Sequence, residues 1–205
     1  MGNRDAGCRP GSFGYSTREV WERCGAFEHG HDVAAKRCQD EIEPDRGGMA
    51  MTRFAIVDTD PVPYLYVDCE CDPTPEAMGA AMAQAFGTVM GFLQRHGIRP
   101  AGRPISVYHD YDPARMRFRV GMPVGADALR AAEAPLSGDT IPAGRALRCT
   151  HVGPYGALRE TYEALERHMD EEGLTMGAVC WESYVDDPAE VPPERLRTDI
   201  HMALG

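Results

Sequence analysis

One short segment near the C-terminus combines the residue types of a ligand-binding or catalytic site. Glu182 and Tyr184 lie two residues apart in an apolar run that predicts a strand, so their side chains share one face. A carboxylate is costly in a dry core, so we expect Glu182 and Tyr184 to face a groove and Trp181 to pack on the helix side. Such a carboxylate attracts cations, and tyrosine rings add roughly 0.5–2 kcal/mol of cation–π attraction.

Two further tyrosines are candidates for the walls of this groove. Tyr155 follows a Gly-Pro turn at the start of a predicted helix, where its ring can overhang the groove. Tyr108 precedes Tyr184 by 76 residues and can supply the opposite wall through an internal repeat. The alternatives are a solvated strand glutamate for Glu182 and plain packing for the tyrosines.

The repeat is visible in the turn residues, which recur at a shift of 75 or 76 positions. The matching pairs are Gly97 with Gly173, Gly102 with Gly177, Tyr108 with Tyr184, and Asp112-Pro113 with Asp187-Pro188. Two similar halves predict a pseudo-twofold, and a groove between halves is a common place for a ligand.

Hydrophobic periodicity and turn signals predict the elements that position these residues. The predicted strands are Phe54–Val57, Tyr64–Cys71, Ile105–Tyr108, Met116–Val124, Ala146–His151, Val179–Val185 and Leu196–Met202. One helix begins after the N-cap Thr74 and ends at Gly97. A second covers Gly156–Glu172, with Gly173 as C-cap and Tyr162 in its packing stripe. The fold class is therefore α+β, with a strand-helix-strand-strand module that occurs twice.

Several short motifs in the second half occur in a recognisable order. They are Gly153-Pro154-Tyr155, Glu171-Glu172-Gly173-Leu174, Glu182-Ser183-Tyr184, Asp186-Asp187-Pro188, Val191-Pro192-Pro193-Glu194 and Leu196-Arg197-Thr198-Asp199-Ile200. With them, the chain from about Arg53 to Leu204 resembles the GyrI-like small-molecule-binding domain, the effector-binding module of AraC-type and MerR-type multidrug regulators. The resemblance implies a duplicated module with a ligand groove between its halves. It also implies that Glu182 lies at the bottom of a pocket that receives aromatic or cationic drugs.

Two functions follow from this resemblance. The first is a free-standing sensor or sequestering protein for an amphipathic, aromatic and cationic small molecule. The second is a hydrolase of cyclopropane-bearing DNA-alkylating compounds, as the resemblance to some free-standing members implies. Glu182 is then the general base, and Tyr155 or Tyr184 donates a hydrogen bond to the developing oxyanion. A gyrase-inhibitory type of protein binding is a third alternative.

Composition narrows the partners. A net charge of −11 over 205 residues argues against a free-standing nucleic-acid-binding surface. We see no apolar run that could span a bilayer and no secretory leader. The seven cysteines are scattered along the chain, which is typical of reduced thiols rather than of a disulfide framework. We therefore expect a cytoplasmic protein without membrane contact. No cofactor motif and no metal cluster occur in the predicted domain, so we expect neither.

The first fifty residues differ in composition from the rest. We expect residues 1–50 to be a poorly ordered extension and residues 51–205 to form the domain. Tyr15–Val20 resembles the opening of a MerR-type DNA-binding domain, but no recognition helix follows. A zinc site of Cys24, His29, His31 and Cys38 is an alternative whose spacing matches no standard finger. His151 and His201 are expected to be surface or hydrogen-bonded residues near strand ends.

Overall fold

Eight strands and two long helices form the part of the chain that this computed structural model describes, residues 53–109 and 115–205. The expectations for residues 1–50, including the zinc ligands and the MerR-like segment, lie outside the described residues, as does the Asp112-Pro113 pair of the repeat. None of the helices in the described ranges is long and apolar enough to cross a membrane.

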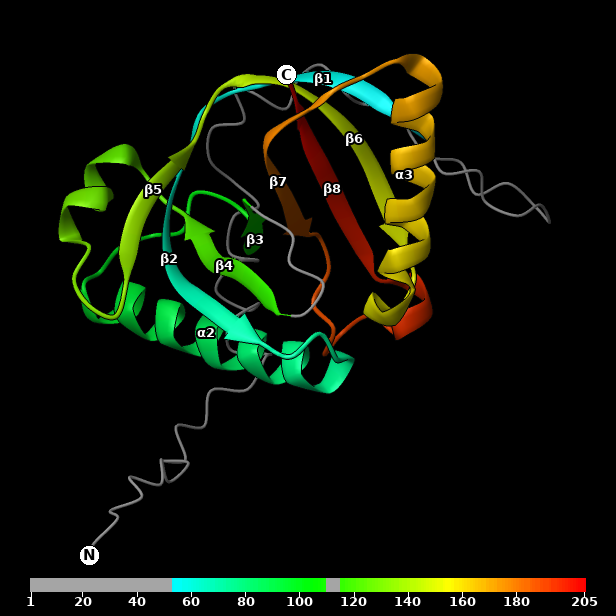
Figure 1. Cartoon of the computed structure of the whole chain (residues 1–205). Coiled ribbons are helices and arrows are strands. Elements are labelled where there is room, and N and C mark those ends of the chain that lie inside the picture. Colours follow the sequence, from blue (N-terminus) through cyan, green and yellow to red (C-terminus); the bar gives the residue numbers. More distant parts are fainter. Residues whose placement is uncertain (1–52, 110–114) are drawn as a thin grey trace, which may run out of the picture.

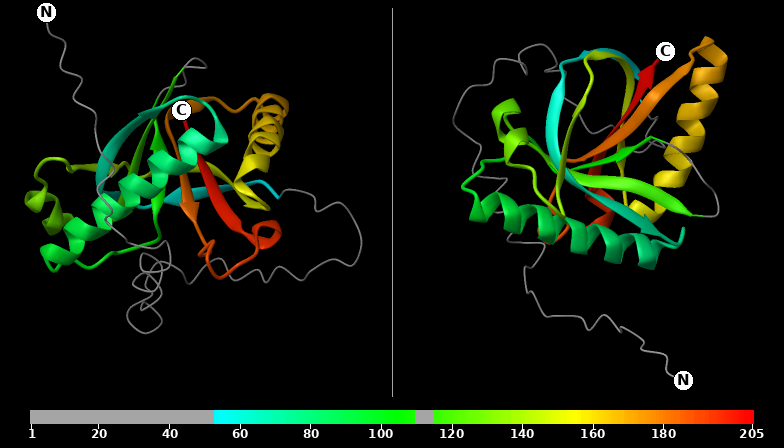
Figure 2. Two further views of the ribbon diagram at one scale, coloured as in Figure 1. Left: turned by 90° about the horizontal axis from the view of Figure 1, so that it is seen from below. Right: turned by 60° about the vertical axis from the view of Figure 1, so that its left-hand side comes forward.

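All strands belong to one antiparallel sheet with the order β1-β6-β8-β7-β3-β4-β2-β5. The strands are β1 (Ala55–Thr59), β2 (Val62–Cys71), β3 (Ile105–Tyr108), β4 (Met116–Pro123), β5 (Ser137–Ile141), β6 (Gly144–Val152), β7 (Met176–Tyr184) and β8 (Arg197–Leu204). The helices are α2 (Pro75–Arg95) and α3 (Leu158–Glu172), with short 3-10 turns η2 (Ala126–Ala131), η3 (Tyr155–Ala157) and η4 (Pro193–Arg195). The sheet curls into a half-barrel, and both long helices lie outside the curl (Figures 1 and 2).

The ends of the helices follow from local sequence signals. The Thr74 hydroxyl accepts a hydrogen bond from the Ala77 N–H at 3.2 Å, and Pro75 occupies the first helical position of α2. Gly173 ends α3 in the left-handed region at φ 63°, as predicted. The start of α3 was predicted two residues early, because the chain first makes the 3-10 turn η3.

Both helices cover the same face of the sheet, as the strand register shows. Val120 packs against α2, and it lies directly opposite Ser106 on the next strand. Ser106 in turn lies opposite Glu182, and Glu182 lies opposite Ile200, which packs against α3. Because residues directly opposite one another in a ladder point to the same face, this row runs from beneath α2 to beneath α3. Glu182 and Ser106 are at its centre.

The inner face of the curl has a separate apolar cluster. Its buried members are Tyr64, Tyr66, Ile105, Val107, Ile141, Ala146, Val179 and Trp181. The prediction that Trp181 packs on the helix side was therefore wrong. It assumed that the helices and the Glu182 side chain lie on opposite faces of the strand, whereas both helices flank the face of Glu182 and leave Trp181 on the inner one.

Strand β5 and the turns η2 and η4 have no counterpart among the predictions. Strand β5 is the short segment SGDTI at the edge of the sheet, and turn η2 has no buried residue. Glycine and aspartate are poor strand formers, so hydrogen bonds to β2 determine the conformation of β5 rather than its own propensity.

Candidate functional site

Glu182 is a buried carboxylate in the middle of strand β7. Only 3% of the residue is exposed. The Tyr162 hydroxyl donates to its Oε1 at 2.7 Å, and the Tyr184 hydroxyl and Ser106 Oγ donate to its Oε2 at 2.8 and 3.2 Å. Three hydroxyl groups from α3, β7 and β3 thus satisfy the carboxylate without neutralising it.

The charge of Glu182 has no cationic partner among the described arginines, none of which forms an ion pair with it. Burial raises the pKa of Glu182, while the hydrogen bonds from Tyr162, Tyr184 and Ser106 act in the opposite direction and, with His151, lower it. The net rise in pKa means that the desolvation of the charge is incompletely compensated.

Tyr184 connects the carboxylate to the two helices. Its ring meets Phe86 of α2 and Tyr155 of η3 edge-on, with ring centroids 5.9 and 5.8 Å apart. Met82 Sδ lies 3.8 Å from its hydroxyl oxygen. Tyr184 is 4% exposed, whereas Tyr155 is 39% exposed, so Tyr155 separates Tyr184 from solvent. Such aromatic pairs contribute about 0.5–1.5 kcal/mol beyond their buried area.

The phenols around Glu182 remain protonated. Burial, followed by the Glu182 charge, raises the pKa of Tyr108, Tyr162 and Tyr184 well above the usual value and that of Tyr155 to about 12. The Tyr108 hydroxyl lies 3.3 Å from Ser106 Oγ, and its ring stacks on Phe118. The site therefore presents neutral hydrogen-bond donors and aromatic surfaces around one acid.

The structure brings together all four residues that the sequence singles out: Glu182, Tyr184, Tyr155 and Tyr108. Their contact with a ligand stays a prediction. Sequence reasoning missed Tyr162 and Ser106 as partners of the carboxylate. The repeat offset of 76 residues that aligns Tyr108 with Tyr184 also aligns Ser106 with Glu182, and this signal could have identified the serine.

The two histidines lie on different faces. His151 is buried, and its ring nitrogens hydrogen-bond to the Thr161 hydroxyl at 2.7 Å and the Pro154 carbonyl at 3.3 Å. His201 stacks on Trp181 at the inner face, with ring centroids 4.8 Å apart. No group of three or more metal-ligating side chains is arranged to hold a metal ion in residues 53–109 and 115–205.

Solved structures with the same fold include the C-terminal domain of EcmrR, with a TM-score of 0.66 and 17% identity over 76% of this chain and 98% of that domain. SAV2435 bound to tetraphenylphosphonium gives a TM-score of 0.51 and 9% identity over 75% and 94% of the two chains. A protein described as a hydrolase from Listeria innocua gives a TM-score of 0.51 and 16% identity over 75% and 92%.

A comparison with curated proteins finds no match. Residues 52–204, by contrast, match the GyrI-like small molecule binding domain. That match covers the whole sheet, both helices and every residue around Glu182. The chain belongs to the GyrI-like family of small-molecule-binding domains.

Proposed function

We propose that this protein binds a lipophilic aromatic cation at Glu182 and acts as a free-standing sensor or sequestering protein. One observation carries the proposal: a carboxylate that is 3% exposed and surrounded by tyrosines forms no ion pair with any described side chain. A buried charge is costly unless it is paired, so a cation that binds beside Glu182 would offset the desolvation of the carboxylate.

The chemistry of the surroundings favours a particular kind of cation. The hydroxyls of Tyr162, Tyr184 and Ser106 already donate three hydrogen bonds to the carboxylate. A cation that lacks hydrogen-bond donors and spreads its charge over aromatic groups is weakly hydrated. It therefore loses little hydration free energy when it enters an apolar site. The rings of Phe86, Tyr155 and Tyr184 offer it edge and face contacts.

Access to Glu182 requires side chains to move. Tyr155 lies between solvent and Tyr184, and it belongs to a three-residue 3-10 turn rather than to a long helix. We infer that Tyr155 rotates outward, together with the partly buried Met82 and Phe86 of α2, and so opens a groove between the helices. A ligand in that groove meets aromatic walls before it reaches the carboxylate.

The proposed groove lies between two halves of similar layout. The element order β2-α2-β3-β4 recurs as β6-α3-β7-β8, and β3 and β7 are neighbours at the middle of the sheet. This order supports the predicted duplication and its pseudo-twofold between β3 and β7. The tetraphenylphosphonium complex of SAV2435, which has the same fold, supports a cationic ligand.

The proposal is tested by charge selectivity. Tetraphenylphosphonium and the uncharged triphenylphosphine oxide, titrated separately into the full chain, present similar aromatic groups with and without a positive charge. We expect saturable binding of the cation and at least roughly tenfold weaker binding of the oxide, the equivalent of about 1.4 kcal/mol. Equal affinity for the two compounds would show that the carboxylate does not select the ligand.

A hydrolase is the second candidate. The raised pKa of Glu182 suits a general base, protonated phenols stand beside it, and a protein described as a hydrolase shares the fold. We keep cyclopropane-bearing alkylating compounds as its proposed substrates. Incubation of the protein with such a compound, followed by measurement of the compound's mass, separates the candidates. A gain of one water by the compound supports the hydrolase, and binding with an unchanged compound mass supports the sensor.

A further inference from the structure

A second pocket lies on the inner face of the curl, on the opposite side of the sheet from Glu182. Its volume is about 360 Å³. The residues that line it are Val62, Ala101, Gly102, Arg103, Ile105, Pro123, Trp181, Ser183 and Asp199. Since Trp181 and Ser183 flank Glu182 on strand β7, their side chains point away from the Glu182 site. The two sites share a strand but no lining side chain.

The wall of this pocket is apolar and aromatic. Trp181 is 5% exposed, and Ile105, 2% exposed, lies beside it on the neighbouring strand. The indole stacks on His201 with an interplanar angle of 2°, which fixes the plane of the ring. Burial lowers the pKa of His201 to about 4, so this imidazole is neutral at pH 7 and adds no charge. A flat apolar group thus has a rigid surface against which to pack.

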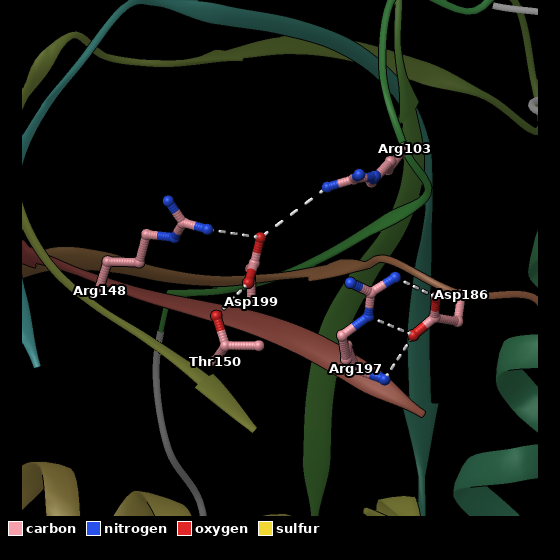
Figure 3. A network of polar contacts seen from close by, with 6 residues as sticks. All are labelled: Arg103, Arg148, Thr150, Asp186, Arg197 and Asp199. Atoms are coloured by element: carbon pink, nitrogen blue, oxygen red, sulfur yellow. Dashed lines mark hydrogen bonds and ion pairs between the residues drawn. The ribbon is translucent and has the colours of Figure 1, made fainter. Parts of the chain in front are cut away.

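The polar end of the pocket is lined by Arg103 and Asp199, and a second arginine, Arg148, lies beside them. Asp199 accepts hydrogen bonds from Thr150 at 2.6 Å and from Arg148 at 3.1 Å. Arg103 approaches the same carboxylate at 3.9 Å, too far for a hydrogen bond, and its side chain is 55% exposed. Figure 3 shows the guanidinium groups of Arg103 and Arg148 on either side of Asp199, pointing toward each other.

The neighbouring Arg197 and Asp186 pair with each other. Arg197 and Asp186 form a two-pronged pair at 2.7 and 2.9 Å, which uses the hydrogen-bonding face of both groups (Figure 3). Together the cluster in Figure 3 has three guanidinium groups and two carboxylates. Asp199 is therefore the one carboxylate in the lining, two guanidinium groups approach it, and the half-exposed Arg103 makes no hydrogen bond to it.

We propose that this inner pocket binds a small aromatic carboxylate. The carboxylate accepts hydrogen bonds from Arg103 and approaches Arg148, while the ring packs on Trp181 and Pro123. A single ring matches a volume of about 360 Å³, which lies at the small end for ligand pockets. The guanidinium fork matches a carboxylate in geometry as well as in charge. This site is independent of the proposed cation site and has the opposite charge preference.

The experiment uses benzoate as the probe, with benzyl alcohol and benzylammonium as its uncharged and cationic counterparts. Calorimetric titration of the full chain should give saturable binding of benzoate and at least about tenfold weaker binding of the other two. Nuclear Overhauser contacts between the benzoate ring and the Trp181 indole should locate it on the unmodified protein. Absence of saturable benzoate binding, binding of benzyl alcohol with equal affinity, or contacts elsewhere would overturn the proposal.

Variants of Arg103 then test whether this residue binds the carboxylate of benzoate. Arg103→Gln should weaken benzoate binding about tenfold, because it removes the main donor to the carboxylate. Arg130→Gln is the matched control: it changes the net charge equally at a side chain that is 87% exposed and does not line the pocket. Tetraphenylphosphonium binding should be the same in both variants. Equal benzoate affinity in the two variants contradicts the role of Arg103, and Arg103→Lys, which keeps the charge but loses the fork, should bind with intermediate affinity.

Discussion

Ser106 and Glu182 lie directly opposite each other on the neighbouring strands β3 and β7, and the serine hydroxyl donates a 3.2 Å hydrogen bond to the carboxylate. This pair is at the middle of the eight-stranded sheet, on the face that both helices cover. A charged side chain buried at the centre of this face does not strengthen the core, because the charge is desolvated. We propose that a ligand, rather than stability, accounts for the position of Glu182.

Replacement of Glu182 by Gln should stabilise the folded protein at neutral pH. The pKa of Glu182 is higher in the folded than in the unfolded protein. The stabilisation from its neutral form is therefore complete below the unfolded pKa and is lost as pH rises through the folded pKa. We expect the variant to gain about 1–3 kcal/mol in free energy of unfolding at pH 8 and less at pH 4. Urea unfolding at both pH values measures the difference. A loss of stability at pH 8 would argue that the charge is fully compensated.

The Tyr162 hydroxyl should matter only while Glu182 is charged. Tyr162→Phe removes the 2.7 Å hydrogen bond to Oε1 and should cost about 1–3 kcal/mol at pH 8. In the Glu182→Gln background the same change should cost less, which a double-mutant cycle reveals as coupling. Tyr155→Phe is the control, because its hydroxyl has no hydrogen bond within the described residues. Additive effects of the two substitutions would mean that Tyr162 acts through packing alone.

His201 should make the protein sensitive to mild acid. Burial, helped by Arg148, lowers its pKa from 6.5 to about 4, while Asp199 acts in the opposite direction. The folded state thus binds fewer protons between these values, and stability falls as pH is lowered from 6.5 to about 4. The loss is on the order of 3 kcal/mol. His201→Phe keeps an aromatic ring on Trp181 and should remove this pH-dependent loss of stability. The free energy of unfolding of the wild type and of the variant, measured across that pH range, gives the difference. If the stability of the two proteins depends on pH in the same way, the pKa of His201 is not lowered by burial.

The residues before the domain should be dispensable. A chain that begins at Met51 retains every strand and helix described here, so its melting temperature and its affinity for tetraphenylphosphonium should match those of the full chain within error. A loss of several degrees in melting temperature would show that residues 1–50 contribute to the fold.

Strand alternation predicted which side chains share a face but not which face meets the helices. It correctly grouped Glu182 with Tyr184 and separated them from Trp181. The error over Trp181 arose because a polar side chain was assumed to avoid the helix side, whereas Tyr162 and Tyr184 provide hydroxyl partners there. Tyr162 was missed because a helical stripe shows that a side chain packs, but only the tertiary structure shows against which residue.

Calorimetric titration of tetraphenylphosphonium into Glu182→Gln measures how much the charge of Glu182 contributes to cation binding. Glu166→Gln is the matched control, because Glu166 is exposed on α3 and is replaced by the same amide. We expect affinity to fall by roughly tenfold to a hundredfold in Glu182→Gln, about 1.4–2.8 kcal/mol, and to stay unchanged in Glu166→Gln. Unchanged affinity in a folded Glu182→Gln protein, with the cation bound to the wild type, would show that the cation binds elsewhere.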